Sequence, residues 1–199
     1  MFKDKLRIWE AAVLVALSVA LCTGTWAQGR QDALSGKLVR LLVLAHSDDD
    51  SEQQIKLDVR NAVLAYLEPI LETAADSRGA EALIMENMDG IAGAARKASQ
   101  GRAVSVSLST ERYPTRQYED LALPAGEYRS LRVTLGAGEG QNWWCVVFPP
   151  LCTQTVLAES AYPAISSEDI ALMKQENGYR LAFRSMELWS GLKAFFENN

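Results

Sequence analysis

Residues 136–152 have the least ordinary spacing in the chain, GAGEGQNWWCVVFPPLC. Three glycines alternate with other residues, and two adjacent tryptophans, a cysteine, a double proline and a second cysteine follow. Four kinds of site use such residues: a phosphate-binding loop, a catalytic cysteine, a carbohydrate platform, or a rigid surface for another protein. The other features of the sequence are needed to choose between these four kinds of site.

The glycines resemble a dinucleotide fingerprint only superficially. In that fingerprint the glycines open a helix whose N-terminus holds the pyrophosphate. Here Trp143, Trp144 and a β-type run follow, so we expect the glycines to form a positive-φ turn that joins two strands. We therefore predict no nucleotide and no cofactor.

The chain has one histidine, His46, followed by Ser47 and Asp48. A nucleophilic serine or cysteine needs a neighbouring base, so a Cys145–His46 or Ser–His46 pair is conceivable. Nothing in the sequence brings such a pair together. We favour a turn and helix entry, keep His46 and Asp48 as a polar site, and predict no catalytic residue.

The acidic run from Asp48 to Glu52 offers carboxylates that suit Ca²⁺. Its spacing is not that of an EF-hand, and we expect a solvated helix start facing the positive end of the helix dipole. One histidine and a pair of cysteines seven residues apart do not match a zinc site. No metal is predicted.

The two tryptophans are neighbours on a predicted strand, so they should point to opposite faces. An exposed tryptophan suits a sugar platform or a protein-contact hot spot, although a core between helices and a sheet could also bury both. Cys145 and Cys152 form an even pair, which in an exported protein favours a disulfide. Two buried free thiols are the alternative.

The N-terminal sequence is typical of an export signal. Lys3, Lys5 and Arg7 precede an apolar run over 11–22, which is short for a membrane-spanning helix and typical of a signal peptide. We place cleavage after Ala27. An uncleaved anchor is the first alternative, and a lipoprotein with Cys22 as the lipidated residue is a weaker one.

Hydrophobic periodicity outlines the remaining elements. It predicts a buried strand over 38–45 and a helix from a capping box at Ser51 to a kink or stop at Pro69. It also predicts a helix over 80–98 that Gly90 and Gly93 weaken, with two shorter pieces as the alternative. Strands follow over 103–110, 127–135 and 143–148, with a loop over 113–126. Ser167 is expected to cap a helix in the tail.

We predict one α+β domain, in which an N-terminal strand and helices pack on a mostly antiparallel sheet and the C-terminal tail is helical. The expected divisions are a signal peptide (1–27), a linker (28–37), the domain (38–155) and a mostly helical extension (156–199). The net charge of −5 argues against nucleic acid as the main partner.

Several motifs in this order resemble the stage II sporulation protein R family, over residues 38–153. They are Ala45-His46-Ser47-Asp48, Lys56-Leu57-x-Val59-Arg60-x-Ala62-Val63, Tyr113-Pro114-Thr115, Leu123-Pro124-Ala125-Gly126-x-Tyr128-x-x-Leu131-Arg132-Val133, and Gly136-x-Gly138-x-Gly140-x-Asn142-Trp143-Trp144-Cys145-Val146-x-Phe148-Pro149-Pro150-Leu151-Cys152. The last motif is long and unusual in composition.

The resemblance implies a signalling protein of sporulation rather than an enzyme. Such proteins are secreted from the forespore into the intermembrane space. There they activate a membrane-embedded aspartic protease of the mother-cell membrane, which processes a pro-sigma factor. We add the expectation that 136–152 forms a rigid hairpin that contacts the protease. The expected partner-binding residues are Gly138, Gly140, Asn142, Trp143, Trp144, Phe148, Pro149 and Pro150.

A cell-envelope hydrolase or carbohydrate-binding module remains as the alternative. Asp48 or Glu139 would then act as the acid and Trp144 as the sugar platform. Such an enzyme needs two carboxylates held about 5–10 Å apart across a cleft. A groove lined by His46, Asp48 and Glu139 would favour this interpretation over the signalling one.

Overall fold

The computed structural model describes residues 2–118, 121–151 and 165–174. It divides into two compact units. One unit contains 34–113 and 127–170, and the other contains 1–33, 114–126 and 171–199. The larger unit holds most of the regular structure and is described first.

A four-stranded sheet organises the larger unit, in the order β2-β5-β1-β6. Its strands are β1 (Val39–Leu44), β2 (Val104–Tyr113), β5 (Gly126–Leu135) and β6 (Asn142–Phe148). β1 pairs in parallel with β5, with Leu41 opposite Leu131. It pairs antiparallel with β6, with Leu41 opposite Cys145. The predicted α+β class is confirmed, and the sheet is mixed because its central pair is parallel.

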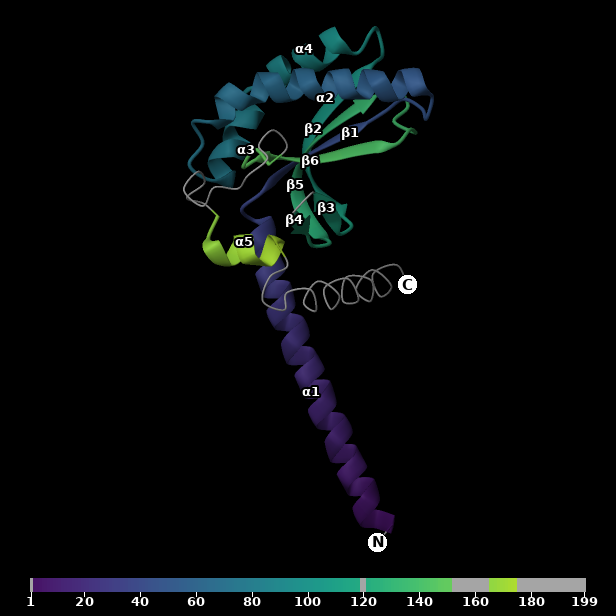
Figure 1. The fold of residues 1–199 in the computed structure, drawn as a ribbon, viewed down its shortest axis with the longest axis vertical. Coiled ribbons are helices and arrows are strands. Elements are labelled where there is room, and N and C mark those ends of the chain that lie inside the picture. The colour runs from purple at the N-terminus through teal and green to yellow at the C-terminus, as the bar shows by residue number, and fades with distance from the viewer. Residues whose placement is uncertain (1, 119–120, 152–164, 175–199) are drawn as a thin grey trace. The chain divides into compact units, whose positions relative to one another are not determined.

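Three helices cover one face of this sheet (Figure 1): α2 (Asp50–Leu71), α3 (Ser77–Glu86) and α4 (Met88–Ala98). α2 buries Val59, Val63 and Leu67, which recur every four residues and form one apolar stripe. α3 begins where the Asp76 carboxylate accepts a hydrogen bond from the Gly79 amide at 2.7 Å. The 80–98 segment does form two helices, but the break falls at Asn87, and Gly90 and Gly93, where the sequence suggested a break, lie inside α4.

The core lies between the helices and the sheet. Alternate residues of β1 point into it, and Val39, Leu41 and Val43 are all fully buried. β2 shows the predicted alternation, because Val106 packs against the core whereas Ser105 and Ser107 are exposed. The odd-numbered residues of β5 complete the layer: Leu131, Val133 and Leu135.

The start and end of α2 differ from the sequence prediction. The helix begins at Asp50 with Asp49 as its N-cap, so the capping box predicted at Ser51 does not form. Pro69 lies inside the helix, which continues to Leu71. A proline near the last turn is tolerated, since the helix needs to run only a short way beyond it.

The opposite face of the sheet buries an arginine. Arg40 is fully buried, and its guanidinium carbon lies 3.8 Å from the centre of the Tyr113 ring and 4.9 Å from that of Tyr128. The Tyr113 hydroxyl also shares a hydrogen bond of 2.6 Å with the hydroxyl of Ser130. Aromatic rings therefore replace part of the hydration that this charge loses on burial.

The smaller unit contains most of α1 (Phe2–Ser35) and a two-stranded sheet of β3 (Arg116–Tyr118) and β4 (Leu121–Leu123). This small sheet occupies the segment predicted to be a loop. α1 is helical through the predicted signal peptide and most of the predicted 28–37 linker. From Arg7 to Ser35 it is long and apolar enough to cross a membrane, a criterion that signal sequences near an N-terminus also meet.

The last described element is α5 (Ser167–Met173). Ser166 rather than Ser167 precedes its first turn, and its hydroxyl oxygen accepts a hydrogen bond from the Asp169 amide at 3.3 Å. Residues 156–164 and 175–199 of the predicted C-terminal extension lie outside the described residues.

Candidate functional site

Two motifs that lie far apart in the sequence meet at one end of the larger unit's sheet. The loop after β1 carries His46, and the loop between β5 and β6 carries the three glycines. The Ala137 amide donates to His46 Nδ1 at 3.0 Å, and the Gln141 amide donates to Asp48 Oδ1 at 2.7 Å. Backbone bonds from Glu139 to the His46 carbonyl and from Gly140 to the Ala45 carbonyl join the same loops.

We call the exposed part of this end the His46–Trp143 surface. Its members are exposed residues chosen from the two loops and the first positions of β6: His46, Asp48, Gly136, Ala137, Glu139, Gln141, Asn142 and Trp143.

Strand order explains why the loops meet. β1 lies between β5 and β6, so the 136–141 segment has to cross the end of β1 to connect them. The predicted hairpin is therefore wrong in one respect, because β6 pairs with β1 and not with β5. The crossing carries the glycine loop directly over the residues that follow β1.

Two of the glycines are required by this close crossing. Gly136 has φ +54°, and a Cβ there would lie 2.3 Å from Nδ1 of His46. A Cβ on Gly140 would lie 2.1 Å from the carbonyl oxygen of Ser47. Both distances are far below van der Waals contact, so side chains at these positions would push the two loops apart.

Side chains of helix α2 form hydrogen bonds to both loops. The Lys56 ammonium donates to the Gln141 carbonyl at 3.1 Å and to the Gln53 side-chain oxygen. The side-chain Nε2 of Gln53 donates to the Ser47 carbonyl at 2.8 Å. Burial lowers the pKa of Lys56, and the nearby Asp48 carboxylate acts in the opposite direction. One buried cation thus links α2, the first loop and the glycine loop.

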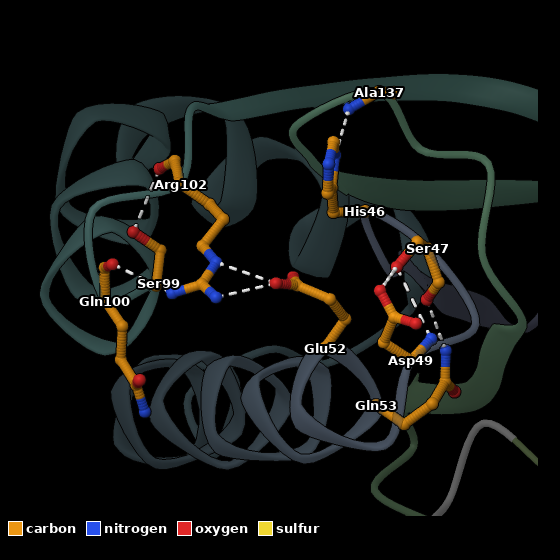
Figure 2. Close-up of polar contacts among 9 residues, drawn as sticks. All are labelled: His46, Ser47, Asp49, Glu52, Gln53, Ser99, Gln100, Arg102 and Ala137. Carbon is orange, nitrogen blue, oxygen red and sulfur yellow. Dashed lines mark hydrogen bonds and ion pairs between the residues drawn. The ribbon is translucent and has the colours of Figure 1, made fainter.

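A second connection ties this end of the sheet to β2 (Figure 2). Glu52 is 7% exposed, and its Oε1 accepts from Arg102 Nη2 at 2.6 Å and from Nε at 3.1 Å. The Gly136 amide donates to the Ala103 carbonyl at 2.8 Å. The surface is therefore hydrogen-bonded to α2 through Lys56 and to the segment before β2 through Ala103, and Figure 2 shows His46 directed at the Ala137 backbone.

The adjacent tryptophans lie on opposite faces of the sheet. Trp143 is opposite Val43 on the helix side, is 37% exposed, and has the Arg60 guanidinium 4.2 Å from its ring centre. Trp144 is opposite Leu42, is half-buried, and makes an edge-to-face contact of 6.4 Å with Tyr113. Trp143 is thus the tryptophan that is available at the surface.

The other predicted contact residues divide between surface and interior. Gly138 and Gly140 lie in the crossing loop, Asn142 is exposed at the start of β6, and Pro150 is half-buried. Phe148 is 5% exposed and belongs to the core, and Pro149 is also buried. The side chains of Phe148 and Pro149 consequently serve the fold.

Cys145, which is 2% exposed, is not placed beside His46. It lies opposite Leu41, five residues before His46, which on an extended strand is roughly 15 Å away. The Ser47 hydroxyl instead donates to the Asp49 carboxylate at 2.8 Å. Among the described residues, neither Cys145 nor Ser47 is hydrogen-bonded to His46, whose Nδ1 accepts from the Ala137 backbone amide instead. Cys152 lies outside the described residues, so the Cys145–Cys152 disulfide stays a prediction.

A groove formed by described residues is not lined by the residues that the hydrolase alternative names. The groove, of about 660 Å³, runs between α2 and α4 and is lined mainly by alanines and glycines, with Tyr66 and Lys97. His46, Asp48 and Glu139 do not line it. The ring of Trp144 makes an edge-to-face contact with Tyr113 and is half-buried, so it does not offer an open platform for a sugar.

Sequence reasoning missed the residues that support the surface, above all Lys56, Arg60, Glu52 and Arg102. A signal for two of them was present, because Lys56 and Arg60 are four residues apart and so share one helix face. Nothing local connected them to the glycine loop or to Trp143.

The comparison with known proteins decides the family. The family model described as "Stage II sporulation protein R (spore_II_R)" matches residues 35–158, which is more than half of the chain. This chain belongs to the stage II sporulation protein R family. The membership supports a role in sporulation, and the predicted resemblance is confirmed.

Among curated relatives, "Stage II sporulation protein R" of Bacillus subtilis (strain 168) is 36% identical over 118 residues. The aligned region covers 57% of this chain and 53% of the relative, so the chain spans about half the length of the curated relative it matches. No solved structure matches. All residues of the His46–Trp143 surface lie inside the region that the sporulation protein R family model covers.

Proposed function

We propose that this chain is an intercompartmental signalling protein of sporulation. On this proposal it is exported across the forespore membrane and activates a membrane-embedded aspartic protease of the mother-cell membrane. The protease then processes a mother-cell pro-sigma factor. The protein itself is a ligand and performs no catalysis.

The main observation in support of the proposal is that two of the motifs that resemble the family lie in contact in the fold. The AHSD and GAGEGQNWW segments lie ninety-one residues apart at His46 and Ala137, yet they form one exposed surface. Two side-chain atoms of the first segment, His46 Nδ1 and Asp48 Oδ1, accept backbone hydrogen bonds from the second and hold the loops together. Such a surface is built to keep a fixed shape, which suits recognition of another protein.

The N-terminal helix supports export. α1 has an apolar stretch, and its composition fits either a signal peptide or an uncleaved anchor. Either form would place the His46–Trp143 surface outside the cytoplasm of the cell that makes it. In that compartment a Cys145–Cys152 disulfide would be stable, and it would fix the segment that follows β6.

The test is reconstitution in a host that does not sporulate. The chain is co-expressed with the membrane protease and its pro-sigma substrate, and substrate cleavage is followed by immunoblot. We expect cleavage only when the chain is present and exported. An export-blocked form that lacks the apolar helix serves as the control and should give none.

A further inference from the structure

The proposed function leaves open what kind of partner group the surface recognises. The position of Arg60 on α2 helps to answer this question. Arg60 lies one turn after Lys56, on the side of the helix that faces β6. Its guanidinium lies over the ring of Trp143, with 4.2 Å between the guanidinium carbon and the ring centre. The pair is therefore part of the same end of the sheet as the glycine loop.

The guanidinium is held in a defined orientation. Arg60 Nε and Nη2 both donate to the side-chain oxygen of Asn61, at 3.0 Å and 2.7 Å. Stacking on the Trp143 indole fixes the plane of the Arg60 guanidinium. The two hydrogen bonds to Asn61 fix the rotation of the guanidinium within that plane. Within the described ranges, Arg60 has no carboxylate partner, so its charge is oriented but not neutralised.

A second cation, Lys56, lies near Arg60. Lys56 lies close enough that the charge of Arg60 helps to lower the Lys56 pKa, after the larger effect of burial. Burial also lowers the pKa of Arg60. Asp48 offsets Lys56, and it already accepts the Gln141 amide. On a chain of net charge −5, this is a local cationic position beside an exposed aromatic ring.

We infer that Arg60 and Trp143 form the contact that selects the partner, by binding a segment in which a carboxylate lies next to an apolar side chain. The inference rests on the proposed function and names the chemistry of that partner. The oriented guanidinium would receive the carboxylate, and the exposed part of the indole would pack against the apolar neighbour. Arginine and tryptophan are, with tyrosine, the side chains enriched at binding hot spots.

The geometry favours this partner over a carbohydrate. A sugar ring stacks on an open aromatic face, and here the guanidinium covers one face of Trp143. A carboxylate, in contrast, would be attracted by the positive charge of the Arg60 guanidinium. Charge complementarity therefore points to an acidic protein segment.

The experiment measures how much exported chain is needed for half-maximal substrate cleavage in the reconstituted system. Arg60→Gln removes the charge, Arg60→Glu reverses it, and Arg60→Lys keeps it but loses the stacked fork. Arg96→Gln is the matched control, because Arg96 is an exposed arginine on α4 in the same unit. Thermal unfolding of each purified variant shows whether it is folded.

We expect the required amount to rise about tenfold or more for Arg60→Glu and roughly three- to tenfold for Arg60→Gln, as for a hot-spot side chain. Arg60→Lys should fall between Arg60→Gln and the parent, and Arg96→Gln should match the parent. Raising the salt concentration should weaken the parent's response more than that of Arg60→Gln.

Folded Arg60→Gln that signals like the parent would overturn the inference while leaving the proposed function in place. An equal loss in Arg96→Gln would also overturn it, because the effect would then follow overall charge. If the parent chain itself gives no cleavage, the proposed function fails and this inference falls with it.

Discussion

His46 accepts a hydrogen bond of 3.0 Å from the backbone amide of Ala137, across a sequence separation of ninety-one residues. This contact joins the loop after β1 to the loop between β5 and β6. The only histidine in the chain therefore has a positioning role, in which its Nδ1 atom holds the glycine loop in place.

Replacing His46 with alanine should loosen the glycine loop without unfolding the domain. The side chain is exposed, so we expect the free energy of unfolding to change by less than about 1 kcal/mol. The Ala137 amide loses its acceptor, and hydrogen exchange at that amide should accelerate while exchange in β1 stays unchanged. Equal protection of Ala137 in both proteins would contradict this role.

Gly140→Ala should damage both folding and signalling. Its Cβ would lie 2.1 Å from the Ser47 carbonyl oxygen, so the loops must separate, at a cost of about 1–3 kcal/mol. Gly93→Ala is the control, because a Cβ there meets nothing within 4 Å and alanine favours a helix interior. Chemical denaturation should show a lower midpoint for Gly140→Ala and an unchanged or higher one for Gly93→Ala.

A comparison of Trp143→Ala with Phe148→Ala should distinguish a loss of partner contact from a loss of folding stability. Phe148 lies in the core, so its loss should lower the free energy of unfolding by about 3–5 kcal/mol. Trp143 is 37% exposed, and its loss should cost less stability but abolish most substrate cleavage. The measurements are urea midpoints and cleavage in the reconstituted system. A stable Trp143→Ala protein with full activity would refute the contact role.

Asp169 should contribute stability that is lost in acid. Burial by itself would raise its pKa, but hydrogen bonds from Lys37 and Ser166 together outweigh this and hold the pKa below its ordinary value. A carboxyl whose pKa is lower in the folded state stabilises the fold above its unfolded pKa of about 3.9. That stabilisation disappears as the pH falls through the folded pKa.

Asp169→Asn should therefore be less stable than the parent by about 1–3 kcal/mol near pH 6, because charge-assisted hydrogen bonds are lost. The difference should narrow as the pH falls below about 4. Urea denaturation of both proteins across this range tests the sign. A difference that widens in acid would show that the Asp169 pKa is not lowered.

The sequence predicted the elements well where one periodic pattern decided them. The four-residue recurrence of Val59, Val63 and Leu67 specified α2, and the alternation in 104–108 specified β2. The short strands β3 and β4 were missed because three residues carry too little pattern, and the prolines at 114 and 124 suggested a loop.

The site was only partly predictable for a different reason. The unusual composition of 136–144 identified the segment, but its contact with His46 depends on β1 lying between β5 and β6. Strand order is a long-range property that no local motif encodes. The start of α2 depends on it too, because Asp48 binds the Gln141 amide and the helix begins after Asp49 instead of at the predicted capping box.

Site-specific photocrosslinking tests the central claim most directly. A benzophenone amino acid is placed at Glu139, which is exposed on the glycine loop, or at Met85, which is 59% exposed on α3. Both proteins are produced with the membrane protease and irradiated. We predict a covalent adduct with the protease from position 139 and none from position 85. Crosslinking from position 85 but not from 139, with both proteins exported and active, would contradict the assignment of the His46–Trp143 surface to partner recognition.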